Sequence, residues 1–153
     1  MRYKLSAPAT LHTTIQLPAS KSISNRALIL HALAQGHIAP SNLSDCDDTR
    51  VMIKALDGNP GHIDILAAGT AMRFLTAYLS VTPGTRIITG TERMQQRPIR
   101  ILVDALRELG AQIEYAGKED FPPLRITGTE LTGEEISLAG NVSSQYILSL
   151  IHI

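Results

Sequence analysis

The fold is decided by the stretch LPASKSISNRA at residues 17–27. A proline and small polar residues close one segment here, and the apolar run ALILHALA at residues 27–34 follows directly. This pattern predicts a helix from about Ser22 to Leu33, with Gly36 as the C′ residue that ends it. The rest of the chain is organised around the start of this helix.

Two cations, Lys21 and Arg26, lie in or beside its first turn, among three candidate N-cap residues: Ser20, Ser22 and Ser24. Positive side chains at a helix N-terminus oppose the macrodipole, typically by roughly 0.3–1 kcal/mol each. The arrangement becomes favourable if an anion binds among the free N–H groups, hydroxyls and cations. One interpretation is a pocket for phosphate or carboxylate. The other is a solvated helix start with incidental charges, and this stretch alone leaves both open.

The composition limits where an anion site can lie. The 153 residues suit one domain or part of a larger protein, and a hydrophobic content of 44% predicts a packed core. The 14 basic and 14 acidic residues cancel to a formal net charge of zero. No overall field attracts nucleic acid or an anionic membrane, so we expect neither as a partner. An anion site must therefore come from a local concentration of charge.

The cellular compartment is predicted from what the sequence lacks. Its single cysteine, Cys46, excludes an internal disulfide bond and fits a reducing compartment. No apolar run approaches the ~20 residues of a membrane span. The first residues contain no apolar signal-peptide core. We therefore expect a cytoplasmic protein.

Hydrophobic periodicity and turn residues predict the remaining elements. Further helices are expected at residues 49–56, around the apolar stripe of residues 71–79, from Pro98 at N1 to Leu109, and from Ser144 onward. Strands are expected at residues 13–17, 62–66, 85–90, 112–115, 124–127 and 136–138. This order indicates an α+β (α/β) fold of β-α-β-α-β-β units. The last helix barely begins before the sequence stops, which indicates the N-terminal part of a longer protein.

Three predicted helix starts offer hydroxyls and backbone N–H groups: residues 20–24, Gly69-Thr70 and Ser143-Ser144. Arg73 follows Thr70 by three residues, and Arg97 begins a fourth helix with the same conflict between charge and dipole. The repetition favours several helix N-termini that point at shared anionic groups over incidental charges.

Other candidate sites are weaker. The acidic run at residues 45–48 lacks the ligand spacing of a calcium loop and is better explained by helix capping. Gly69-Thr70 is not followed by the Gly-Lys-Ser/Thr of a nucleotide-binding loop. No metal-ligand spacing occurs among the histidines, which are His12, His31, His37, His62 and His152. We therefore expect no metal site.

Four motifs resemble the signatures of one family, the EPSP synthases, which are the 3-phosphoshikimate 1-carboxyvinyltransferases of the shikimate pathway. They occur in family order and spacing over nearly all of the chain: LPASKSISNRA at 17–27, AGTAMR at 68–73, QRPI at 96–99 with LVDAL at 102–106, and GNVSSQY at 140–146. The resemblance implies transfer of the enolpyruvyl group of phosphoenolpyruvate to the 5-hydroxyl of shikimate 3-phosphate, with release of phosphate. This step belongs to chorismate and aromatic amino acid biosynthesis.

The resemblance also implies residues for shikimate 3-phosphate. Lys21 would be catalytic and would touch both substrates near the reacting centre. Ser22 and Arg26 would hold shikimate 3-phosphate. Ser143 and Ser144 would bind its phosphate.

A second set of residues is implied for phosphoenolpyruvate. Gly69 would let this substrate approach the backbone, and Arg97 would bind its anionic groups. Arg73 would support that site, and Gln145 would lie between the two substrates.

The resemblance implies a division of the chain as well. Family members are much longer and have two domains of β-α-β-α-β-β units. Residues 1–19 would be a strand segment of the other domain, and residues 20–153 would hold the first unit and the start of the second. The acid–base carboxylates would lie in the absent half, so we expect weak substrate binding without turnover. No metal or organic cofactor is implied, and we expect the full-length parent to be a monomer.

Two alternatives stay open at this stage. One is a relative that transfers enolpyruvate to UDP-N-acetylglucosamine, although the pairing of Ser22 with Arg26 favours a small phosphorylated acceptor. The other is a non-catalytic anion-binding or assembly domain.

Overall fold

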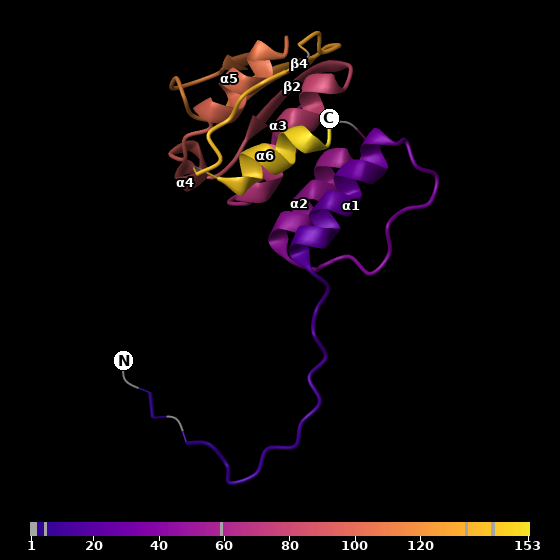
Figure 1. Cartoon of the computed structure of the whole chain (residues 1–153), viewed down its shortest axis with the longest axis vertical. Coiled ribbons are helices and arrows are strands. Elements are labelled where there is room, and N and C mark those ends of the chain that lie inside the picture. The colour runs from indigo at the N-terminus through magenta and orange to yellow at the C-terminus, as the bar shows by residue number, and fades with distance from the viewer. Residues whose placement is uncertain (1–2, 5, 59, 134, 142) are drawn as a thin grey trace.

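The computed structural model describes residues 3–4, 6–58, 60–133, 135–141 and 143–153 (Figure 1). Its elements are, in chain order, α1 (Lys21–Leu33), α2 (Asp47–Leu56), β1 (His62–Asp64), α3 (Gly69–Val81), β2 (Gly84–Thr89), α4 (Glu92–Gln95), α5 (Arg100–Glu108), β3 (Gln112–Tyr115), β4 (Leu124–Gly128) and α6 (Ser144–Ile151). Within these described ranges, no helix is long and apolar enough to cross a membrane.

The four strands form one mixed sheet in the order β1-β2-β4-β3. β1 and β2 are parallel, with Ile63 opposite Ile88, whereas β4 is antiparallel to both of its neighbours. α3 connects the two parallel strands, as a parallel pair requires a crossover. The segment from β1 to β4 is therefore one β-α-β-α-β-β unit, and the predicted α/β fold class is confirmed.

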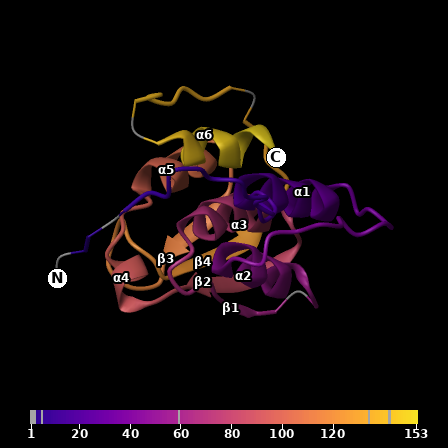
Figure 2. The same ribbon diagram turned by 90° about the horizontal axis from the view of Figure 1, so that it is seen from below.

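α3 is the centre of the fold and is buried over most of its length. Figure 2 shows it between the sheet on one side and α1 and α6 on the other. The helix side of the sheet carries these buried apolar residues: Ile63, Ile88, Ile113, Leu124 and Ile126. The opposite face carries the exposed pair Glu114 and Arg125. Because β-strand side chains alternate, this pattern places a single core on the helix side of the sheet.

The C-terminal end of α3 is capped by an arginine from the next strand. Arg86 is only 3% exposed. Its guanidinium donates to the carbonyl oxygens of Thr82, Pro83 and Gly84 at 3.1, 2.7 and 3.3 Å. A cation is favourable at this end of a helix because it faces the negative end of the macrodipole.

The predicted boundaries of α1 are nearly correct. Ser20 is the N-cap, and its hydroxyl accepts the N–H of Ile23 at 3.4 Å. The expected C′ residue is wrong, because Gln35 takes the left-handed conformation with φ of 49°. Gly36 lies one position further on and donates its N–H to the His31 carbonyl at 3.0 Å. Helix α1 thus ends in a Schellman motif without a glycine at the left-handed position.

Two predicted strands are absent, and one helix begins later than expected. Residues 13–17 are exposed and pair with no strand, as part of a segment that leaves the folded body (Figure 1). Residues 136–138 also join no sheet, and Ile136 and Leu138 line a pocket together with residues of α6. Pro98 is not at N1, since the N-cap of α5 is Ile99. The four-residue helix α4 was not predicted, because so short a segment has no apolar periodicity.

We predict that residues 1–18 can be removed without loss of stability. The described residues in 6–18 are exposed, while Ser20 caps α1 from within the retained chain. The urea-unfolding free energy of the shortened chain should lie within about 0.5 kcal/mol of the full chain. A larger loss would show that the segment packs on the folded body.

Candidate anion-binding site

Helices α1, α2, α3 and α6 begin at the same edge of the folded body. The first residues of α1, α3 and α6 lie toward the lower side of the body in Figure 1, the side from which Figure 2 is seen. The Gln145 side-chain amide on α6 donates to the Thr70 hydroxyl on α3 at 3.1 Å. Free N–H groups of several helices therefore face one region, which is favourable for an anion.

The start of α1 presents its polar side chains to solvent. Lys21, Ser22 and Arg26 are all exposed, as binding residues must be. Lys21 Nζ lies 3.6 Å from Asp48 Oδ1 in the first turn of α2. From the sequence, the acidic run at residues 45–48 was explained by helix capping alone, and the pairing of Asp48 with Lys21 was not predicted. Asp48 places a carboxylate beside the lysine predicted to be catalytic.

Two buried residues of the same stretch join α1 to α2 and to the segment just before it. Ser24 accepts the N–H of Ser44 at 2.8 Å. The Thr49 hydroxyl donates to Asn25 Oδ1 at 2.9 Å. Of the three candidate N-cap serines, Ser24 is therefore part of the core, and Ser22 is left free at the edge.

The start of α3 is packed against an arginine from a distant part of the sequence. A Cβ atom placed on Gly69 would lie 2.5 Å from Arg97 Nη1. Glycine therefore allows the Arg97 guanidinium to lie against the first turn of α3. Arg97 itself precedes α5 and is not in its first turn, so the predicted conflict with the dipole of that helix is wrong. Its cation lies instead at the N-terminus of α3.

Arg73 lies on the core side of the Gly69–Arg97 contact and not on its solvent side. Its side chain is buried, donating from Nη1 to the Gly69 carbonyl at 3.1 Å and from Nη2 to the Pro98 carbonyl at 3.4 Å. Its Cζ is 5.9 Å from the centre of the Tyr146 ring. Burial lowers the pKa of the Arg73 guanidinium, and the nearby charge of Arg97 lowers it further. Arg73 thus holds both sides of the loop around Arg97.

Helix α6 completes the arrangement. Ser143 is its N-cap and accepts the N–H of Gln145 at 3.2 Å, while Ser144 is exposed. The Tyr146 hydroxyl donates to the Pro98 carbonyl at 3.1 Å. Tyr146 was predicted only as part of a motif. Its role could have been inferred from the general rule that a buried tyrosine hydroxyl requires a hydrogen-bond partner.

The C-terminal end of α6 lies against α1 and α3. The His152 and Phe74 rings meet edge to face, with their centroids 5.6 Å apart. Burial lowers the pKa of His152, and so does the positive charge of Arg26. The end of α6 therefore lies on the second turn of α3, and α1 also packs against α3.

Except for Lys21, the cations at this edge have no carboxylate partner among the described residues. The ion pairs in the described part of the chain are Lys21–Asp48, Arg100–Asp120 and Arg125–Glu114. Arg26, Arg73 and Arg97 take part in none of them. Arg86 at the opposite end of α3 has the carbonyl groups of that helix end as its partners. An anion would supply what the N-terminal cations lack.

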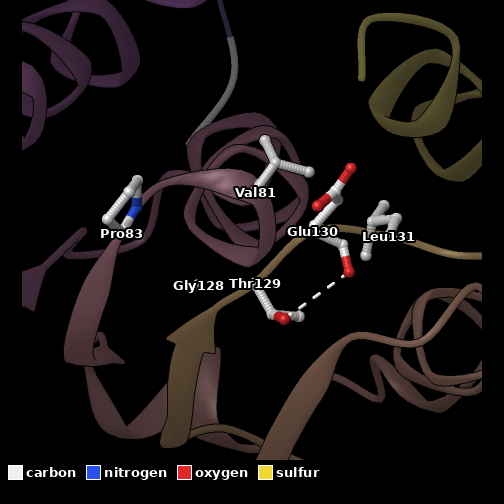
Figure 3. Close-up of a pocket in the computed structure, with 6 residues that line it drawn as sticks. All are labelled: Val81, Pro83, Gly128, Thr129, Glu130 and Leu131. Carbon is white, nitrogen blue, oxygen red and sulfur yellow. Dashed lines mark hydrogen bonds between the residues drawn. The ribbon is translucent and has the colours of Figure 1, made fainter.

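Two pockets differ in how well their lining residues suit an anion. A pocket of about 270 Å³ at the N-terminal edge is lined by Ala67, Arg93, Met94 and Arg97. A larger pocket of about 560 Å³ lies at the other end of α3 (Figure 3), lined by Val81, Pro83, Gly128, Thr129, Glu130 and Leu131. Its charged lining residue is a glutamate, so it does not suit an anion. Among the described residues, no group of three His, Cys, Asp or Glu side chains could hold a metal ion.

The fold and the edge together define an α/β protein in which several helix N-termini and several cations lie at one edge. A family model described as EPSP synthase (3-phosphoshikimate 1-carboxyvinyltransferase) matches residues 5–58 and 59–152. The chain belongs to the EPSP synthase family.

Curated relatives agree with this assignment. The chain is 74% identical over all of its 153 residues to the 3-phosphoshikimate 1-carboxyvinyltransferase of Bacteroides fragilis, of which it covers 37%. It is 42% identical over 92% of its length to the enzyme of that name in Shewanella halifaxensis, covering 39% of it. The chain therefore spans less than half the length of these relatives.

A solved structure supports the fold. The EPSP synthase of Acinetobacter baumannii superposes with a TM-score of 0.75 at 23% sequence identity, over 90% of this chain and 37% of that one. At this identity the likeness concerns the fold alone.

We predict that Gly69→Ala weakens anion binding without unfolding the chain. The added Cβ would meet only the end of the flexible Arg97 side chain, which must then move. Binding of inorganic phosphate, followed by NMR titration, should weaken by about tenfold, or about 1.4 kcal/mol. The urea-unfolding free energy should change by no more than about 1 kcal/mol.

The matched control is Gly61→Ala, because a Cβ at Gly61 meets nothing within 4 Å. Equal phosphate affinity in the Gly69→Ala and Gly61→Ala variants would contradict a binding role for the Gly69–Arg97 contact.

Proposed function

We propose that the chain is the N-terminal part of an enzyme that transfers the enolpyruvyl group of phosphoenolpyruvate to the 5-hydroxyl of shikimate 3-phosphate. The observation that carries this proposal is the packing of Arg97 on Gly69, beside a helix α6 that is tied to α3 by Gln145 and Thr70. This arrangement offers cations and N–H groups without carboxylate partners to two phosphorylated ligands. Membership of the family supports the choice of substrates.

Shikimate 3-phosphate is assigned to the edge between α1 and α6. Ser22 and Arg26 are exposed on α1 and would hold this substrate, and Ser143 and Ser144 at the start of α6 would bind its phosphate. Hydroxyls at a helix N-terminus bind phosphate together with the backbone N–H groups. Lys21 extends from the same edge and would touch both substrates.

Phosphoenolpyruvate is assigned to the start of α3. Gly69 allows close approach of the ligand to the backbone, and Arg97 would bind its anionic groups. Arg73 supports this site from behind, because its donors are committed to backbone carbonyls. Gln145 would lie between the two substrates, and its bond to Thr70 places it at the boundary of α3 and α6.

The reaction proceeds by addition and elimination. The 5-hydroxyl oxygen bonds to C2 of phosphoenolpyruvate and loses its proton, while C3 gains a proton. Phosphate then leaves C2 as C3 gives up a proton, and this restores the double bond. Lys21 and the arginines orient the substrates and stabilise their charge. The proton transfers are assigned to carboxylates of the remaining part of the protein.

The proposal includes no metal and no organic cofactor. That the parent protein is a cytoplasmic monomer stays a prediction, as does the assignment of residues 1–19 to a second domain.

We predict that the 153-residue chain binds shikimate 3-phosphate but does not turn over. Calorimetry should detect weak binding by the wild type, and Lys21→Ala should reduce the affinity by about tenfold or more, since a charged hydrogen bond is lost. An assay of phosphate release with both substrates should show no activity.

The matched control is Lys54→Ala, which removes a lysine from the last turn of α2. Turnover by the chain alone would refute the assignment of proton transfer to another part of the protein. Binding of UDP-N-acetylglucosamine in place of shikimate 3-phosphate would indicate the related transferase, and the absence of any substrate binding would indicate a non-catalytic role.

A further inference from the structure

We propose that the cavity at the C-terminal ends of α1 and α2 is a second binding site, which takes a small organic cation with an apolar body. The cavity holds about 460 Å³, within the range of roughly 300–1,000 Å³ that small-ligand sites have. None of the four sequence motifs includes a described residue that lines it. The site is independent of the proposed function, because it lies at the opposite end of these helices.

Helices α1 and α2 lie side by side (Figure 1) and run in the same direction. Lys21 and Asp48 pair in their first turns, whereas Ala32 and Leu56 in their last turns line the cavity together. The 13 residues of α1 span about 20 Å at 1.5 Å per residue. The cavity is therefore separated from the anion-binding edge by the length of a helix.

Two helix C-termini and one carboxylate adjoin the cavity. The C-terminal end of a helix carries a partial negative charge from its carbonyl groups. Asp57 is the C-cap of α2, lines the cavity, and takes part in none of the ion pairs among the described residues. No lysine or arginine of the described chain lines the cavity, although Lys54 lies in the last turn of α2. The cavity therefore favours a positive group over an anion.

The turn that ends α1 supplies neutral hydrogen-bond acceptors. A Cβ on Gly36 would lie 2.5 Å from His31 Nδ1, so glycine allows the imidazole ring to lie against this turn. His31 and Gln35 both line the cavity. A neutral imidazole nitrogen and an amide oxygen can each accept a hydrogen bond from an ammonium group. The polar part of the cavity thus has acceptors in addition to the Asp57 carboxylate.

The rest of the lining suits an apolar body. Tyr78 of α3 is half-buried and places an aromatic ring at the cavity. Aromatic rings attract cations through their faces and also pack against apolar groups. The remaining walls are apolar side chains of α1, of α2 and of the loop between them: Leu28, Ala32, Ala39, Ile53 and Leu56. An ammonium group on a small aromatic or aliphatic frame would match both parts of the lining.

The larger cavity at the end of α3 (Figure 3) lacks this combination, although it also contains a carboxylate, Glu130. The buried Arg86 guanidinium already binds the carbonyl groups at the C-terminal end of α3. Within the described residues, the caps of α1 and α2 are backbone N–H groups instead. The negative ends of α1 and α2 are therefore the ones that still lack a cation.

The test titrates the 153-residue chain with three probes that share one ring and follows the amide shifts by NMR. Benzylamine carries a positive charge, benzyl alcohol carries none, and benzoate carries a negative charge. Benzylamine should shift the amides of residues 31–36, 53–57 and 78 with one common dissociation constant, and should bind about tenfold or more tightly than benzoate. Asp57→Asn should weaken benzylamine binding by about fivefold, as loss of an exposed ion pair can, and leave benzyl alcohol binding unchanged.

The matched control is Glu130→Gln, which removes a carboxylate from the cavity at the end of α3. It should leave benzylamine affinity unchanged, which excludes a general effect of net charge. Binding of inorganic phosphate should be equal in Asp57→Asn and the wild type, because the anion-binding edge lies at the other end of α1.

Every other outcome would overturn the proposal. Such outcomes are equal affinities for benzylamine and benzoate, an equal loss of benzylamine affinity in Asp57→Asn and Glu130→Gln, and benzylamine shifts gathered around Val81 and Glu130. The absence of any benzylamine shift would overturn it as well. A loss of phosphate binding in Asp57→Asn would show that this carboxylate acts through the fold and not as part of a separate site.

Discussion

The site depends on the hydrogen bonds that the buried Arg73 guanidinium donates. This guanidinium donates to the carbonyls of Gly69 and Pro98, which come from the start of α3 and from the loop after α4. Tyr146 reaches the same Pro98 carbonyl from α6. Three segments far apart in the sequence are thereby held around one cation. An arginine without a carboxylate partner is costly in a core, and its fixed fork of donors explains why it can replace several weaker contacts.

The fold explains why the cations gather at one edge. Two parallel strands require a crossover, and α3 supplies it through the centre of the structure. Helices α1 and α6 pack on α3 with their first turns at the same side of the body (Figure 1). The arginines at the two ends of α3 differ in their partners. Arg86 is satisfied by carbonyls at the C-terminal end, whereas Arg97 lies against the first turn at the other end and has no ion-pair partner among the described residues.

Local sequence signals predicted most of the fold. Apolar periodicity and caps placed five of the helices and four of the strands near their observed bounds, because these signals act within one turn or one strand. The failures share a cause, since residues 13–17 and 136–138 have strand-like patterns without a partner strand. The site was predicted as a set of helix starts. The burial of Arg73 and the position of Arg97 against Gly69 depend on contacts between distant segments, which one sequence does not reveal.

The central claim is that α1, α3 and α6 present one shared anion site. Amide chemical-shift mapping of the isotope-labelled chain during titration with shikimate 3-phosphate tests it most directly. We expect the largest shifts at residues 20–26, 69–73 and 143–146, with one common dissociation constant. Shifts gathered at the pocket around Val81 and Glu130, or different constants for the three helix starts, would contradict it.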